Sequence, residues 1–236
     1  MSLRSLSCVA VAVAVSSSAS AALITGWTMP TAFPTGTGNV PTGTVYLPPG
    51  PNGAGVADQG ITAGTQLRSV HALAAATYTS PAGNGSQYAF SSNNWTPGDF
   101  YEATFSTTGF TDINLSWDQA RSSTGPAAFK VFMSVDGGTN FAELFSYTVL
   151  QSGGGGAPGT WSSVTYNALY TNTLNLGLAA ENQGTVIIRF QNAEAVASAA
   201  TGSNRIDNIM VYSGPVPAPS AIALLGLAGL VGRRRR

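Results

Sequence analysis

Apolar and polar residues alternate along the middle of the chain with a period of two. The alternation is found in six stretches, which centre on Ala103, Leu115, Val131, Tyr147, Ile188 and Ile209. No window keeps the 3.6-residue apolar period of an amphipathic helix for long. Alternation of this kind predicts strands that bury one face, so the chain is predicted to be all-β.

Turn-forming residues separate the alternating stretches. Asp136-Gly137-Gly138-Thr139-Asn140 lies between two of them and predicts a hairpin. Short strands joined by such turns, with few helices, are typical of a β-sandwich, and within that class we favour the jelly roll. The predicted core contains Ile113, Leu115, Trp117, Val131, Met133 and Ile188. The Gly/Pro/Thr-rich stretch 30–64 is expected to form irregular coil over a sheet edge.

The first 21 residues have the features of a secretory signal peptide. Arg4 precedes an apolar run over Leu6–Val15, and Ala19 and Ala21 fit an A-x-A cleavage site. The only cysteine, Cys8, would leave with this peptide. The mature protein is therefore predicted to have no disulfide and no cysteine metal site.

The last 22 residues combine prolines, an apolar stretch and four arginines. The apolar stretch runs from Ser220 to Gly232, which is 13 residues, against the roughly 20 of a relaxed membrane helix. The terminal arginines predict that this end stays in the cytoplasm while the preceding domain lies outside. These residues could form a sorting signal that is cleaved after export, or, as the alternative, a simple tail anchor that stays in the membrane.

This tail resembles the PEP-CTERM sorting tail of Gram-negative bacteria. The matching residues are Val216, Pro217, Pro219, Arg233, Arg234, Arg235 and Arg236, while Ala218 stands where the family usually has Glu. The signal peptide predicts export by Sec, and the resemblance implies a transient stay in the inner membrane. It further implies cleavage by an exosortase near the prolines and delivery to the cell surface or extracellular matrix. The chain then divides into a signal peptide (1–21), a β-sandwich ectodomain (22–214) and a sorting tail (215–236).

The ectodomain shows a second resemblance. It is similar to the jelly-roll ectodomains that often precede PEP-CTERM tails. Six segments carry the similarity: Ser91–Trp95, Gly98–Glu102, Leu115–Gln119, Ser122–Pro126, Ser134–Phe141 and Asn204–Ile209. That resemblance implies a surface module without an agreed catalytic set.

The charge balance argues against nucleic-acid binding. The chain between Arg4 and the terminal arginines contains ten acidic residues but only five basic ones, which are Arg68, Arg121, Lys130, Arg189 and Arg205. A nucleic-acid binder needs a basic face.

The sequence offers no convincing catalytic set, and no enzyme or cofactor is predicted. His71, the only histidine, has no Gly-x-Ser-x-Gly nucleophile elbow beside it, so we expect a structural role. Asp112 and Asp118 lie too far apart along one strand for glycoside hydrolysis. Asp99 and Glu102 would point to opposite faces of a regular strand.

Two kinds of ligand contact remain. Asp207 interrupts the last alternating stretch and could hold a structural calcium ion, or it could pair with Arg205 or Arg189, which we favour. Trp161, Trp95 and Tyr101 are the candidates for stacking on a ligand, with Trp161 the best placed.

The sequence therefore predicts a non-catalytic exported surface or matrix protein. The alternative is a carbohydrate-binding jelly-roll module that acts on exopolysaccharide. A glycan-active enzyme is less favoured. An ice-binding protein is also less favoured, because ice binding needs regularly spaced Thr-x-Thr rows, and the Thr-x-Thr pairs of this chain have no constant interval.

Overall fold

The computed structural model describes residues 21–32, 40–41, 45–46, 49–50, 53–153 and 155–214. Ala19 and the sorting residues Val216, Pro217, Ala218, Pro219 and Arg233–Arg236 lie outside the described residues. Within the described part, no helix is long and apolar enough to span a membrane.

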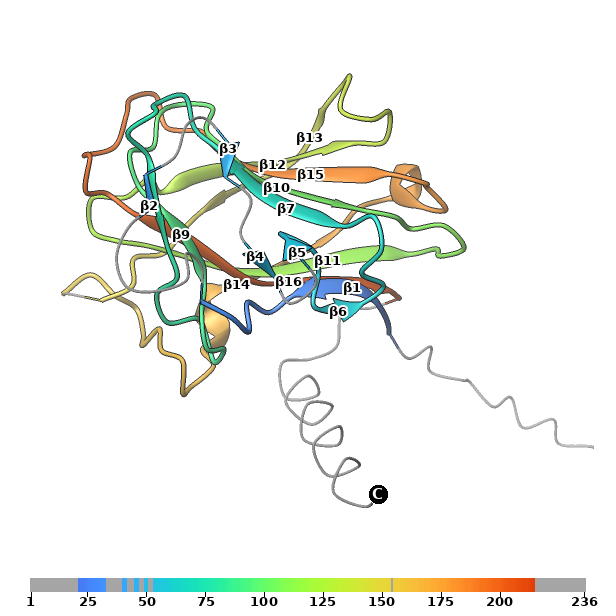
Figure 1. The fold of residues 1–236 in the computed structure, drawn as a ribbon, viewed down its shortest axis with the longest axis horizontal. Coiled ribbons are helices and arrows are strands. Elements are labelled where there is room, and N and C mark those ends of the chain that lie inside the picture. The colour runs from blue at the N-terminus through green and yellow to red at the C-terminus, as the bar shows by residue number, and fades with distance from the viewer. Residues whose placement is uncertain are drawn as a thin grey trace, which may run out of the picture.

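The described chain is all-β and forms two facing sheets (Figure 1). Sheet A has the order β14 (Thr171–Asn175), β11 (Ile113–Arg121), β16 (Asn204–Ser213), β9 (Phe90–Ser92), β8 (Thr77–Thr79) and β2 (Val40–Pro41), with β1 (Ala22–Trp27) beside β16 and β6 (Gln59–Gly60) beside β1. Sheet B has the order β13 (Ala142–Thr148), β12 (Ala128–Ser134), β15 (Val186–Asn192), β10 (Phe100–Phe105), β7 (Gln66–Val70) and β3 (Val45–Tyr46). β4 (Pro49–Gly50) pairs with β5 (Gly53–Ala54) in a two-stranded sheet.

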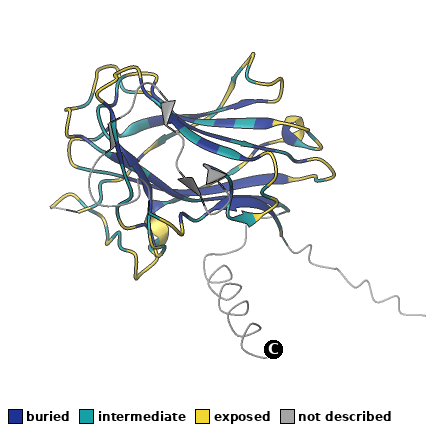
Figure 2. Ribbon diagram, in the orientation of Figure 1, coloured by how far each residue is buried: buried dark blue, intermediate teal, exposed yellow. Residues whose placement is uncertain are grey.

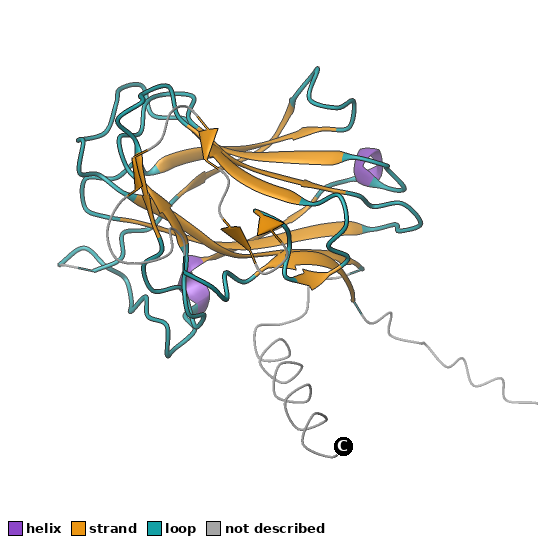
Figure 3. Cartoon of the chain, viewed as in Figure 1, coloured by secondary structure: helices purple, strands orange, loops and turns teal. Residues whose placement is uncertain are grey.

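The helices of the described residues are short. They are two 3₁₀ turns, η1 (Ala168–Tyr170) and η2 (Leu178–Ala180), which Figure 3 shows at the ends of the strand layers. This content confirms the all-β prediction.

The core lies between the two sheets, because the long strands β10, β11, β12, β15 and β16 turn their apolar residues inward (Figure 2). The six predicted core residues are all buried there: Ile113, Leu115, Trp117, Val131, Met133 and Ile188. The predicted hairpin at 136–140 also forms and joins β12 to β13. The Asp136 carboxylate closes its turn by accepting the N–H groups of Thr139 and Asn140.

The stretch 30–64 departs from the expected coil. Its described parts include five two-residue strands, of which β2 extends sheet A and β3 extends sheet B. Backbone pairing with β8 and β7 gives these short segments their strand geometry.

A bulge in β16 decides which side chains face the outside of sheet A. Ser116 pairs with Met210, whereas Asp118 pairs with Asp207, so one extra residue is accommodated near Asn208. Asn208 has a positive φ of 45°. The bulge keeps Ile206 and Ile209 in the core and leaves Asp207 on the same strand face as Arg205.

Candidate functional site

The three aromatic residues predicted to stack on a ligand are separated in the structure. Trp95 and Tyr101 are fully buried, with ring centroids 5.0 Å apart. The Trp95 indole N–H donates to the carbonyl of Ser92 at 3.0 Å. A ring without exposed surface cannot stack on a ligand, so the prediction was wrong for these two residues. Trp161 alone of the three is partly exposed.

Trp161 is held in place by its neighbours. Its indole N–H donates to the carbonyl of Ala82 at 2.7 Å. The ring of Tyr170 meets it edge to face at a centroid distance of 5.2 Å. The Tyr170 hydroxyl in turn donates to the carbonyls of Gly159 at 2.7 Å and Gln151 at 3.1 Å, which ties the loop before Trp161 to η1. The indole is thus ordered before any ligand arrives.

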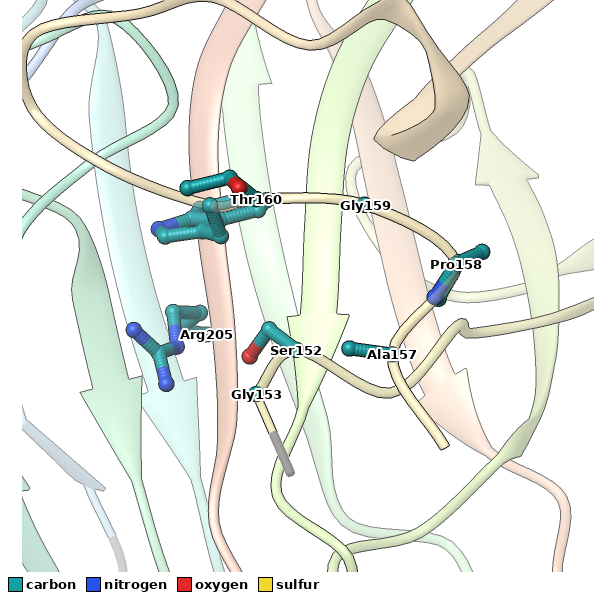
Figure 4. A pocket seen from close by; sticks show the side chains of 8 residues that line it. Ser152, Gly153, Ala157, Pro158, Gly159, Thr160 and Arg205 are labelled. Atoms are coloured by element: carbon teal, nitrogen blue, oxygen red, sulfur yellow. The ribbon is translucent and has the colours of Figure 1, made fainter. Parts of the chain in front are cut away.

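A cavity of about 590 Å³ lies beside Trp161 (Figure 4). Its lining consists of Ser152, Gly153, Ala157, Pro158, Gly159, Thr160, Trp161 and Arg205. Figure 4 shows the Arg205 side chain across the cavity from Pro158. Except for Arg205, which comes from β16, these residues belong to the segment between β13 and η1.

A second cavity, of about 230 Å³, also includes Arg205 in its lining. The other lining residues are Thr77, Thr79, Pro81, Ser91, Ser92, Asn93, Thr201 and Ser203. The register places Arg205 directly beside Ser91, and Ser91 beside Thr79, across three neighbouring strands. Arg205, Ser91 and Thr79 therefore lie side by side on sheet A, with the Ser91 hydroxyl buried and donating to the carbonyl of Asn204 at 3.1 Å.

Arg205 has no carboxylate of the described residues within ion-pair distance. Its guanidinium carbon lies 5.7 Å from the ring centroid of Trp161, within the range of a cation–π contact. Burial lowers the pKa of the Arg205 guanidinium, because the charged form loses hydration. Sequence reasoning considered Arg205 only as a partner of Asp207 and missed its place in both cavities.

Asp207 does not form either of the predicted ion pairs. Its buried carboxylate accepts the backbone N–H groups of Asn84 and Asn208, each at 2.8 Å, and contacts the Ser86 hydroxyl at 2.5 Å. Arg189 is instead bound to Glu102 in sheet B. The ion-pair prediction was wrong because the loop before β9 supplies the partners of this carboxylate.

Asp118 lies near Asp207 and shares its surroundings. The side chains of Asn84 and Asn208 donate to the Asp118 carboxylate at 3.0 Å and 2.8 Å, and Thr171 donates at 2.5 Å. Burial raises the pKa of Asp207 to about 8, and the nearby Asp118 adds to the effect.

The same contacts test the predicted calcium ion. Each oxygen of these two carboxylates has a donor from the protein. The described residues contain no group of three His, Cys, Asp or Glu that could hold a metal ion. The arrangement thus accounts for Asp207 without calcium, and calcium binding stays a prediction.

His71 belongs to a buried Ser-His-Asp arrangement. Its Nδ1 lies 3.1 Å from the Asp99 carboxylate, and its Nε2 lies 3.0 Å from Ser69 Oγ and 3.1 Å from Ser92 Oγ. All four side chains are buried. Burial would raise the pKa of Asp99, but contacts with His71, Thr96 and Ala72 outweigh it and hold that pKa below its usual value. The burial of the whole arrangement agrees with the structural role expected for His71.

The carboxylates weighed for hydrolysis are engaged elsewhere. Asp99 contacts His71, while Glu102 lies between Arg68 and Arg189. Asp118 belongs to the asparagine network described above, and Asp112 accepts a hydrogen bond from Asn175.

Comparison with known proteins gives likenesses only at the level of solved structures. No family model matches the chain, and no curated protein matches it. The K3 adhesin domain of Lys-gingipain from Porphyromonas gingivalis is 15% identical over 81% of this chain and 100% of its own, with a TM-score of 0.41. The module TmCBM61, solved with β-1,4-galactotriose, is 9% identical over 64% of this chain and 90% of its own, with a TM-score of 0.37. A non-crystalline cellulose specific carbohydrate-binding module, CBM28, is 15% identical over 58% of this chain and 80% of its own, with a TM-score of 0.34.

Proposed function

We propose that this protein is a non-catalytic, exported module of jelly-roll type that binds a glycan on the outer face of sheet A. The supporting observation is the partly exposed indole of Trp161, held by Ala82 and Tyr170 at the edge of a cavity of about 590 Å³. Sugar rings have an apolar face that packs on an aromatic ring, and their hydroxyls pair with polar groups around it.

The walls around Trp161 suit a sugar chemically. Ser152 and Thr160 place hydroxyl groups beside Trp161 in the first cavity, and Thr79 and Thr201 add hydroxyl groups in the second. Neither cavity is lined by an Asp or Glu among the described residues. Glycoside hydrolysis needs two carboxyl groups about the scissile bond, so the chemistry of this site favours binding over cleavage.

Removing the indole should abolish most of the affinity. We expect Trp161→Ala to weaken glycan binding by about 30-fold or more, as is typical when an aromatic hot spot is truncated. Trp161→Phe keeps an aromatic face, so its glycan affinity should stay within a few-fold of that of the wild type. The measurement is a glycan array of neutral and acidic polysaccharides followed by titration calorimetry on each positive glycan.

Phe145→Ala is the matched control, because Phe145 is an exposed aromatic residue of sheet B, 37% accessible, in strand β13. It should bind like the wild type. Unchanged affinity of Trp161→Ala, or no binding to any glycan of the array, would contradict the proposed function.

We also propose that the protein reaches the surface through its tail. The Pro217-x-Pro219 segment cannot form regular backbone hydrogen bonds, which favours an extended, cleavable stretch outside the bilayer. The support is the sequence resemblance and the short apolar stretch. Mass spectrometry of the surface fraction should find chains that begin at Ala22 and end near Pro217–Ser220. Arg236-terminated chains as the main surface species would refute processing, as would unchanged fractionation after deletion of the host's exosortase.

A further inference from the structure

We propose that Arg205 makes this site selective for acidic glycans, by pairing with the carboxylate of a uronic acid residue while a neighbouring sugar packs on Trp161. The inference rests on the proposed function and specifies its ligand class. It follows from the charges, the burial and the placement of Arg205.

Arg205 differs from the other basic side chains between the two ends of the chain. Arg68 and Arg189 share Glu102, and Lys130 pairs with Glu143. Arg121 donates to the carbonyls of Val149, Ser122 and Ser123. Within the described residues, Arg205 has neither an ion pair nor a hydrogen bond from its guanidinium, so its donors are available.

The surroundings of Arg205 favour an anion. Acidic residues outnumber basic ones two to one between the ends of the chain, yet none of the described residues that line the two cavities is acidic. Arg205 itself is partly buried. A cation that has lost hydration and has no counter-charge gains more interaction free energy from an arriving carboxylate than a fully exposed cation does. The planar guanidinium can bind both carboxylate oxygens at once.

The placement of Arg205 suggests a ligand of more than one sugar. It belongs to the lining of both cavities, with Trp161 in one and Thr79 and Ser91 in the other. A sugar on the Trp161 side and an acidic sugar at Arg205 would then be neighbours in one chain. The partly exposed Thr79 of the second cavity would meet the hydroxyls of the sugar residue beyond.

The test compares acidic polysaccharides with their neutral counterparts. Polygalacturonate, alginate and hyaluronate are each titrated before and after carboxyl reduction, which replaces the carboxylate by a hydroxymethyl group and keeps the backbone. Dextran sulfate and dextran form a second pair that separates sulfate from carboxylate. The wild type should bind at least one acidic form about 10-fold more tightly than its reduced form, and added salt should narrow the difference.

Arg205→Gln should remove this preference, so that the acidic form and its reduced form bind with affinities within a few-fold of each other. Lys130→Gln removes the same charge from sheet B, where Lys130 is exposed, and should keep the preference. Equal, Trp161-dependent binding of acidic and reduced forms would overturn the inference and leave the proposed function standing. A preference for dextran sulfate without one for any carboxylated form would overturn the uronate assignment. Absence of binding to all of these glycans and to the array would overturn both.

Discussion

Glu102→Ala is expected to lower the free energy of unfolding by about 3 kcal/mol, the lower end of the usual loss when a buried ionic partner is removed, because the carboxylate is buried while the two guanidinium groups are partly exposed. Glu102 is directly opposite Arg68 in β7 and Arg189 in β15. Its carboxylate lies 2.6 Å from Arg68 Nε and 2.7 Å from Arg189 Nε, and the side chain is only 3% exposed. Without it, two guanidinium groups would face each other across the middle of sheet B.

Glu143→Ala provides the comparison, since Glu143 also forms an ion pair, at 2.8 Å from Lys130, but with both partners exposed. It should lose less than about 1 kcal/mol. Urea unfolding of both variants measures the difference. Similar losses in the two variants would show that the Glu102 cluster is not a structural element of sheet B.

Trp95→Ala is expected to lower the free energy of unfolding by about 3–5 kcal/mol, because it leaves a large cavity in the core. The Trp95 ring contacts His71 at a centroid distance of 4.4 Å and Phe129 at 5.6 Å. Its indole N–H also loses the carbonyl of Ser92 as acceptor. Trp161→Ala, at the surface, should lower the free energy of unfolding far less than Trp95→Ala does, and should weaken glycan binding far more.

Thermal and urea unfolding of the two tryptophan variants, with glycan titrations on the folded protein, test this division. Trp95→Phe should recover part of the lost stability, because it refills part of the cavity. The account would be contradicted if Trp95→Ala unfolded like the wild type, or if Trp95→Phe lost glycan affinity while remaining folded.

Period-two alternation predicts the strands of this protein well where a strand is long and one face is buried. β11 and β12 lie where the sequence analysis expected them, and Leu115 and Val131 are buried as the pattern requires. The hairpin at Asp136–Asn140 is a local signal, because its turn closes through the side chain of its own first residue.

Features that depend on distant segments were not predictable in this way. The alternation cannot be extended through the Pro97-Gly98 turn, so the inward direction of Trp95 was ambiguous from the sequence. The loop around Asn84 and Ser86 satisfies Asp207 across more than 120 positions of the chain, and no local pattern shows that. Arg205 was recognisable as an outward residue because Ile206 is apolar. The position of residues 152–153 and 157–161 beside Arg205 was not recognisable.

The central claim, that a glycan binds at Trp161, is tested most directly by the indole N–H signals of the ¹⁵N-labelled protein. The chain has four tryptophans, and Trp27, Trp95 and Trp117 are buried. Oligosaccharides prepared from the three acidic polysaccharides, from their reduced forms and from each positive glycan of the array are added stepwise, and Trp161→Phe assigns the fourth signal. The account predicts that the Trp161 signal shifts with saturation while the other three stay in place. A Trp161 signal that does not move, or shifts confined to the buried tryptophans, would contradict it.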